Sequence, residues 1–195
     1  MQRSFLSETA TNLSASHISS ASLANMPDLG KPWPVAPRPF FEEAFGSWLG
    51  RVATCYQISV RTLWETSTGL DLPNLGKAGW ILFPPVCASA LHQLSSLARV
   101  SEGRLAAIQM PPEWMVHRRY LVYCFRCLVL NDADVSAPRW KREWLNPEAE
   151  YCTAHHSLLE TVPASIFEKS ANFDAALGAM SRYRTPRFPG NIRLR

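Results

Sequence analysis

Three cysteines and one histidine in the second half of the sequence have the spacing of metal ligands. Cys124 and Cys127 form a C-x-x-C pair, and Cys152 and His155 form a C-x-x-H pair further along the chain. Zinc takes four thiolate or imidazole ligands in a tetrahedron, and two such pairs supply them. Because the protein would then fill all four positions, the pattern predicts one structural zinc site with no position left for a substrate.

Two alternatives to this ligand set stay open from the sequence alone. A C-x-x-C pair also occurs in thioredoxin-like redox sites, where it follows a strand and begins a helix, and residues 120–123 could form such a strand. That interpretation leaves the C-x-x-H pair unexplained, so zinc is favoured. His156 could replace His155 as the fourth ligand, but only His155 repeats the two-residue spacing.

The remaining cysteines and a short acidic pair indicate no second chemistry. Cys55 and Cys87 lie on apolar segments, and we expect both to be buried, because free cysteine usually is. Asp132 and Asp134 are interpreted as part of a solvated loop, since charges prefer the surface. The sequence contains no nucleophile elbow, P-loop, Rossmann glycine fingerprint or H-E-x-x-H motif, so we predict that the protein is not an enzyme.

Length and charge restrict the class of protein. A chain of 195 residues holds one domain or two small ones. No apolar run approaches the roughly 18 residues that span a membrane, and the N-terminus lacks the basic and apolar segments of a secretory signal. We therefore predict a cytoplasmic protein whose cysteines are thiols or metal ligands. The net charge of +4 permits contact with nucleic acid without requiring it.

The elements that must position these residues are predicted to be mainly α-helical. We expect a disordered, serine-rich segment at 1–32, a helix-turn-helix-like helical domain at 33–112, a small zinc-ribbon or zinc-finger module at 113–165, and a C-terminal helix with a basic tail at 166–195. Trp33 lies in a proline-rich strap that leads into the helical domain, and we expect it to dock on the core.

The helical domain is predicted to contain two helix-turn-helix units. The first helix begins near Glu42 and Glu43, whose charges suit a first turn, and Ser59 caps the second helix. Ser101 has the same place in a second pair of helices. Two plain helical hairpins would give the same pattern. Residues 72–85, which are rich in glycine and proline, are expected to form a linking loop between the units.

Basic side chains point to a binding role. The predicted second helices carry arginine, and arginines in the zinc module alternate with tyrosine and tryptophan, which suits phosphate contact and base stacking. The alternative is that the aromatic residues pack around the metal while the arginines solvate the module. The candidate contacts to nucleic acid or an acidic partner are Arg61, Arg104, Arg118, Arg119, Arg126, Arg139, Lys141, Arg142, Arg182, Arg184 and Arg187.

The order of motifs along the chain is typical of a known family. A proline-led entry at residues 37–39 precedes the helical motif E-A-F-G-S-W-L-G-R at residues 43–51. A tyrosine-led C-x-x-C pair follows, and W-K-R-E-W at residues 140–144 precedes the C-x-x-H pair and Leu159. In this order the chain resembles the TniQ family, the target-selection proteins of Tn7-like transposons, which include TnsD. The tryptophan pair before C-x-x-H is the most specific part.

The resemblance implies a helix-turn-helix-like domain, zinc-finger modules and no catalytic activity. Family members connect a target-recognition element, either attachment-site DNA or an RNA-guided CRISPR effector, to the AAA+ regulator TnsC, which brings in the transposase. We therefore expect an adaptor whose partners are a TnsC-like ATPase, DNA or RNA and, in the RNA-guided case, a CRISPR effector. A homodimer is left open. A site-specific DNA-binding protein and a domesticated protein with another partner are the alternatives.

The sequence departs from the family pattern after the histidine. Many members carry a further C-x-x-C there, whereas no cysteine follows Cys152 in this chain, so only one zinc site is expected. His156 stands where the family usually has glycine. The chain also lacks the long C-terminal DNA-binding extension of TnsD-type members, which favours an adaptor over an autonomous DNA reader.

Overall fold

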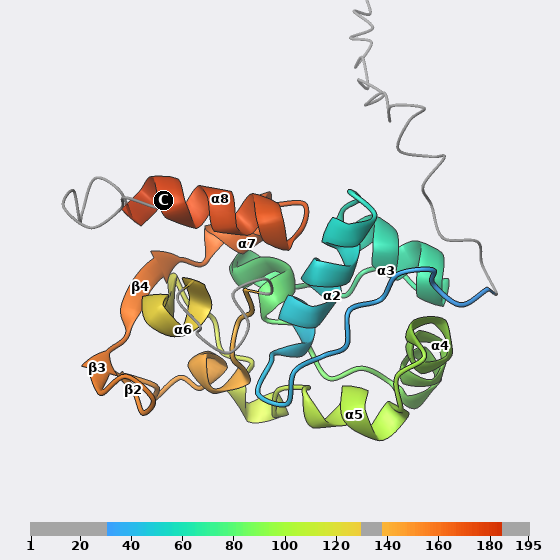
Figure 1. The fold of residues 1–195 in the computed structure, drawn as a ribbon, viewed down its shortest axis with the longest axis horizontal. Helices are drawn as coiled ribbons and strands as arrows, with labels where there is room; N and C mark the ends of the chain where they lie inside the picture. Colours follow the sequence, from blue (N-terminus) through green and yellow to red (C-terminus); the bar gives the residue numbers. More distant parts are fainter. Residues whose placement is uncertain (1–30, 130–137, 185–195) are drawn as a thin grey trace, which may run out of the picture.

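The computed structural model of the chain describes residues 31–129 and 138–184, and it is mainly helical, as predicted. Figure 1 shows α2 to α5 at one end, the short strands with α6 at the other, and α7 and α8 along one side. Most of the serine-rich segment, Asp132, Asp134 and Arg187 lie outside the described residues. The α-helices are α2 (Phe45–Cys55), α3 (Val60–Thr68), α4 (Ala88–Ala98), α5 (Glu102–Ala107), α6 (Phe125–Val129), α7 (Ser165–Lys169) and α8 (Phe173–Arg184), the 3-10 helices are η1 (Gly76–Ile81), η2 (Pro112–Trp114) and η3 (Arg142–Leu145), and the strands are β1 (Tyr120–Tyr123), β2 (Tyr151–Cys152), β3 (Ser157–Leu158) and β4 (Glu160–Pro163).

The first helix starts later than the sequence suggested. Glu42 and Glu43 precede α2 rather than occupying its first turn, so that prediction was wrong. The residue before α2, Ala44, is extended at φ −76° and ψ 142°, and its N–H donates to the carbonyl of Trp140. A tertiary contact therefore holds this stretch out of the helix, and the Glu43 carboxylate accepts hydrogen bonds from Ser47 and Arg51 instead.

The turns between α2 and α3 and between α4 and α5 are built alike. Ser59 and Ser101 both act as N-caps, as predicted, since each hydroxyl accepts from a backbone N–H three residues on. Two residues before each serine, Gln57 and Arg99 adopt positive φ angles of 55° and 52°. The shared turn supports a repeated unit. Whether either helix pair has the geometry of a DNA-reading helix-turn-helix stays a prediction.

Residues 72–85 are more than a linking loop, because η1 lies within them and buries Trp80 against α2. Two glycines on α2 permit this approach. A Cβ on Gly46 would lie 2.1 Å from the Trp80 carbonyl oxygen, and one on Gly50 would lie 2.7 Å from the Trp80 ring. On its other side the Trp80 ring meets Phe167 of α7 edge-on, with 5.3 Å between ring centroids. The segment therefore joins α2 to the C-terminal helices.

One hydrophobic core extends across the predicted domain boundary at residue 112. Trp33 docks on it as predicted: its side chain is buried beside Trp48, with 6.4 Å between ring centroids. Trp140 is fully buried and packs on Tyr123 at 5.6 Å and on Phe167 at 5.0 Å between centroids. The domain division itself stays a prediction.

Among the described residues of the second half, the strands form two small antiparallel sheets. In the first, β1 pairs with β4, and Tyr123 lies opposite Glu160. In the second, β2 and β3 form a hairpin in which Tyr151 lies opposite Leu158. A bridge between Glu43 and Lys141 joins this half to the segment before α2. No helix among residues 31–129 and 138–184 is both long and apolar enough to cross a membrane.

The prediction that Cys55 and Cys87 are buried was wrong, because both are exposed. Cys55 is the last residue of α2, beyond the face that carries Trp48 into the core. Cys87 is the residue before α4, where its side chain lies within 3.3 Å of the Ser89 hydroxyl. Position at a helix end outweighs the usual preference of cysteine for the interior.

Candidate metal centre

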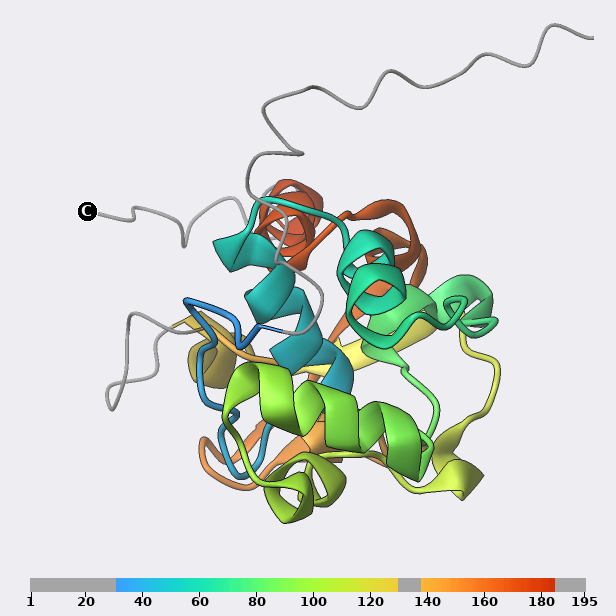
Figure 2. The ribbon, with the colours of Figure 1, turned by 90° about the vertical axis from the view of Figure 1, so that its right-hand side faces the viewer.

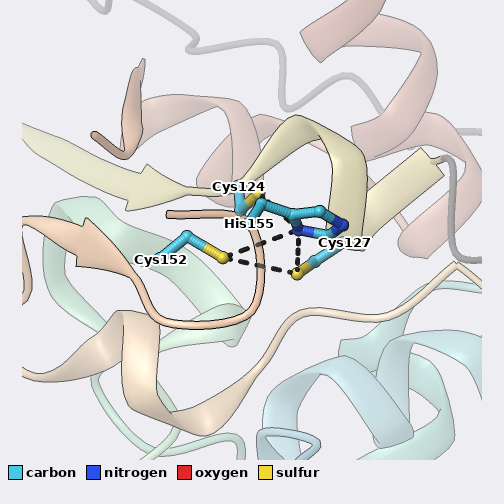
Figure 3. Close-up of side chains that lie close together, drawn as sticks. All are labelled: Cys124, Cys127, Cys152 and His155. Carbon is cyan, nitrogen blue, oxygen red and sulfur yellow. Dashed lines mark hydrogen bonds between the residues drawn. The ribbon is translucent and has the colours of Figure 1, made fainter. Parts of the chain in front are cut away.

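The four predicted ligands come from two strand ends and the segments that follow them. Cys124 follows β1 directly, and Cys127 lies in the single turn of α6. Cys152 ends β2, and His155 lies in the turn between β2 and β3. Pairing of β1 with β4, which follows the hairpin along the chain, brings the two pairs together. Figure 3 shows the three sulfur atoms and the imidazole directed at one another.

The geometry of this cluster fits a tetrahedral metal ion. The ligand atoms all lie within 4.8 Å of one another. Nδ1 of His155 is 3.4 Å from the sulfur of Cys124, 3.2 Å from that of Cys127 and 3.7 Å from that of Cys152. The sulfurs of Cys127 and Cys152 are 3.6 Å apart. Metal–sulfur bonds of about 2.3 Å and metal–nitrogen bonds of about 2.0 Å place tetrahedral ligands about 3.5–3.8 Å apart, so the four residues could hold one metal ion.

The structure places His155, and not its neighbour His156, among the sulfurs. All three thiols belong to one cluster with the imidazole, an arrangement that a two-cysteine redox site does not need. His156 is exposed and adopts φ 46°, the left-handed region that favours glycine. The turn between β2 and β3 thus explains why glycine suits this position.

Replacing His156 with glycine is expected to raise the free energy of unfolding by about 0.5–1 kcal/mol, because the left-handed conformation strains a residue with a Cβ. Metal content should stay unchanged, since the imidazole lies outside the cluster. Thermal unfolding and metal analysis of the variant would check both statements. His156→Ala is the matched control and should bring no gain, and loss of metal from the glycine variant would contradict the assignment of His155.

Protons compete with a metal at this site. Burial and the neighbouring thiols raise the pKa of the Cys127 thiol to about 12. Three thiolates at such short distances require a cation to offset their repulsion. Metal binding must therefore release protons, and the affinity for metal falls as the pH falls.

A buried ionic network that was not predicted from the sequence anchors this centre to the helical half. Glu43 is fully buried and accepts from Nε and Nη2 of Arg51, each at 2.9 Å, from the Ser47 hydroxyl at 2.8 Å and from the Phe40 N–H at 3.1 Å. The Trp140 N–H donates to the same Ser47 hydroxyl at 2.9 Å. The signal was present as glutamate, serine and arginine spaced four residues apart, a spacing at which side chains on or beside a helix can meet.

The predicted basic contacts divide into engaged and exposed side chains. Arg139 pairs with Glu42 at 2.8 Å and lies 3.7 Å from the centroid of Phe40, and Arg142 donates to the Ala107 carbonyl. The side chains engaged within the chain are Arg104, Arg118, Arg139, Lys141, Arg142 and Arg184. The exposed ones are Arg61, Arg119, Arg126 and Arg182, of which Arg61 also pairs with Glu65 on its own helix at 2.9 Å. The exposed side chains could contact a partner without breaking buried interactions within the chain.

Arg182 and Arg184 belong to the C-terminal helix α8. Arg184 is buried and donates to both carboxylate oxygens of Glu160, at 2.8 and 3.0 Å, while its guanidinium lies 3.7 Å from the centroid of Phe125. Burial and the Glu160 carboxylate raise the pKa of Tyr123 on the adjacent strand. This side chain fastens α8 to β4 beside the metal centre.

These observations define a mainly helical protein that carries one closed Cys3His cluster, which its core fixes against the helices. The sequence matches the TniQ family model over residues 34–159, more than half of the chain. The protein belongs to the TniQ family, and membership implies target selection in Tn7-like transposition. No curated protein and no solved structure matched the chain.

Proposed function

We propose that the protein is a non-enzymatic adaptor, which links a target-recognition complex to a TnsC-like AAA+ ATPase during transposition. The observation that carries this proposal is the TniQ match, which covers the helical half and the Cys3His cluster as one stretch at residues 34–159. The target-recognition side is target DNA or a CRISPR effector with its RNA. A cytoplasmic location and self-association as a homodimer belong to the same proposal.

Zinc is the proposed metal of the Cys3His cluster. Three thiolates and one imidazole suit zinc, which has no redox chemistry and accepts a tetrahedral shell. The residues that would hold it are Cys124, Cys127, Cys152 and His155. With four protein ligands the site has no position for substrate, so its role is to hold β1, α6 and the hairpin of β2 and β3 together.

A rigid connection between the two halves supports a bridging role. A fixed separation between two contact surfaces lowers the conformational entropy lost when a protein joins two partners. The Glu43–Arg51 network and the packing of Trp140 hold the metal module against α2, so the surfaces on the two halves keep their spacing. Because the core crosses residue 112, a partner bound to one half would be held in a fixed position relative to the other half.

The experiment that tests the adaptor is recovery of the tagged, metal-loaded protein from its host, with mass spectrometry of its partners and sequencing of bound nucleic acid. We expect a AAA+ ATPase, with a CRISPR effector in the RNA-guided case. Cys127→Ser should lose these partners, while Cys55→Ser, which changes an exposed cysteine outside the cluster, should keep them. One enriched DNA sequence without an ATPase would overturn the adaptor.

That outcome would favour the second candidate, a site-specific DNA-binding protein. The supporting observation is the pair of similar serine-capped turns that precede α3 and α5, together with the exposed Arg61 on α3. A site-specific reader should prefer its sequence to random DNA by about a thousandfold or more. An adaptor should bind duplex DNA weakly and without preference.

A further inference from the structure

Arginine side chains from two segments surround one hollow between the proline-rich strap and the turn from α4 to α5. The hollow has a volume of about 460 Å³ and is lined by Arg38, Pro39, Arg99, Val100, Ser101 and Arg104. Figure 2 shows the strap, in blue, beside this turn, in green. Of these three arginines, only Arg104 was among the contacts predicted from the sequence. Neither the family match nor the metal centre accounts for the hollow.

The cations around the hollow are uncompensated. Arg38 and Arg99 are exposed, and within the described part of the chain neither guanidinium has an ion pair or side-chain hydrogen bond. None of the described residues that line the hollow is acidic. The nearest acid along the chain, Glu102, is already engaged by His92, with 2.7 Å between its carboxylate and Nδ1. The hollow therefore favours an anion.

The strap holds its side of the hollow in place. The carbonyls of Pro37, Arg38 and Pro39 accept hydrogen bonds from Trp48 Nε1, Arg51 Nη2 and Arg104 respectively, the last through both Nε at 3.2 Å and Nη2 at 2.9 Å. These consecutive contacts fix the backbone that carries Arg38. Binding an anion beside a fixed backbone costs less conformational entropy than ordering a flexible arm.

An exposed aromatic ring beside Arg104 indicates the kind of anion. Phe41 is 71% exposed, and the Arg104 guanidinium lies 5.6 Å from the centroid of its ring. Arginine donors in a planar fork suit phosphate oxygens. An exposed ring beside them suits an unpaired base, because base stacking on aromatic side chains accompanies phosphate contact in single-strand binding. A base inside a duplex could not reach this ring.

We infer that this hollow binds a backbone phosphate of single-stranded nucleic acid, with Arg38, Arg99 and Arg104 around the phosphate and Phe41 stacked on a neighbouring base. The inference goes beyond the adaptor role, since neither recovery of an ATPase nor its absence decides it. It adds Arg38, Arg99 and Phe41 to the residues that contact a partner.

The test is fluorescence anisotropy of the full, metal-loaded chain with labelled single-stranded DNA and RNA of about 16 nucleotides and with a matched duplex, at several salt concentrations. Arg38→Ala and Arg99→Gly are each expected to weaken single-strand binding about tenfold and to lower the salt slope by about one. Glycine suits the positive φ of Arg99, so that variant should fold normally. Phe41→Ala should weaken single-strand binding about tenfold while leaving duplex binding unchanged.

Lys77→Ala is the matched control, because it removes an exposed cation on η1 outside the hollow. It should leave single-strand affinity within about twofold of the original, since an isolated surface charge contributes little. Equal losses in Lys77→Ala and the two arginine variants would overturn the site, as would unchanged binding in Arg38→Ala and Arg99→Gly. If the arginine variants lost affinity only for the duplex and Phe41→Ala changed no affinity, the assignment to a single strand would be overturned. Comparison of the single-stranded DNA with the single-stranded RNA shows which nucleic acid the hollow prefers.

Discussion

Replacing Cys127 with serine is expected to abolish metal binding and to unfold the segment from β1 through β4. A structural zinc ion contributes about 10 kcal/mol or more to the folding of a small module, and a whole domain is stable by only about 5–15 kcal/mol. Loss of the metal through loss of one ligand therefore removes about as much free energy as stabilises the whole domain, and the segment unfolds. Because Tyr123 and Trp140 join this segment to the shared core, the helical half should melt at a lower temperature as well.

Metal analysis, hydrogen exchange and thermal unfolding would check this result. The original protein should carry one zinc per chain, and cobalt in its place should show the absorption of tetrahedral thiolate ligation. Cys55→Ser and Cys87→Ser are the controls, because both cysteines are exposed and lie outside the cluster. A metal-free protein whose Cys127→Ser variant melts like the original would disprove the zinc assignment.

Replacing Arg51 with methionine is expected to destabilise the protein by about 3–5 kcal/mol, because it leaves the carboxylate of Glu43 buried without its cation. For a chain of this size the melting temperature should fall by roughly 10 °C. Burial already raises the pKa of Glu43 above its ordinary 4.5, against the effect of Arg51. Without Arg51 the pKa rises further, so the folded state holds its proton to higher pH than the unfolded state does.

The sign of the pH dependence follows from this difference. The Arg51→Met variant should lose stability as the pH rises above 4.5 through the raised pKa of Glu43, so its deficit should be smaller in mild acid than at neutral pH. Denaturant unfolding at several pH values would measure it. Adding Glu43→Gln removes the stranded charge and should recover part of the loss.

The exposed pair of Arg61 and Glu65 on α3 is the matched control for this network. Nη1 of Arg61 and Oε1 of Glu65 are also 2.9 Å apart, but the two side chains are 64% and 37% exposed respectively. Arg61→Met should therefore cost no more than about 0.5 kcal/mol. Equal losses in Arg61→Met and Arg51→Met would show that burial does not decide the strength of these pairs.

Local signals in the sequence were enough to predict several elements. The serine caps at Ser59 and Ser101, the docking of Trp33 and the spacing of the Cys3His cluster all depend on residues a few positions apart or on a strong preference of one side chain. The start of α2 and the burial of Cys55 were predicted wrongly, because tertiary contacts and position at a helix end override average preference.

The sequence by itself determined the three cysteine ligands and left His155 and His156 as candidates for the fourth, since ligand type and spacing are read along the chain, and the structure places His155 among the sulfurs. The sequence also determined the family, because the motifs occur in a fixed order along the chain. Only the tertiary structure decided which arginines are already engaged and which face solvent, since that depends on partners far away in the sequence. Arg184 of α8 reaches Glu160 of β4, whereas Arg38 of the strap and Arg99 of the turn from α4 to α5 line one hollow. The free energy of such contacts depends on burial and distance in space, which spacing along a chain does not encode.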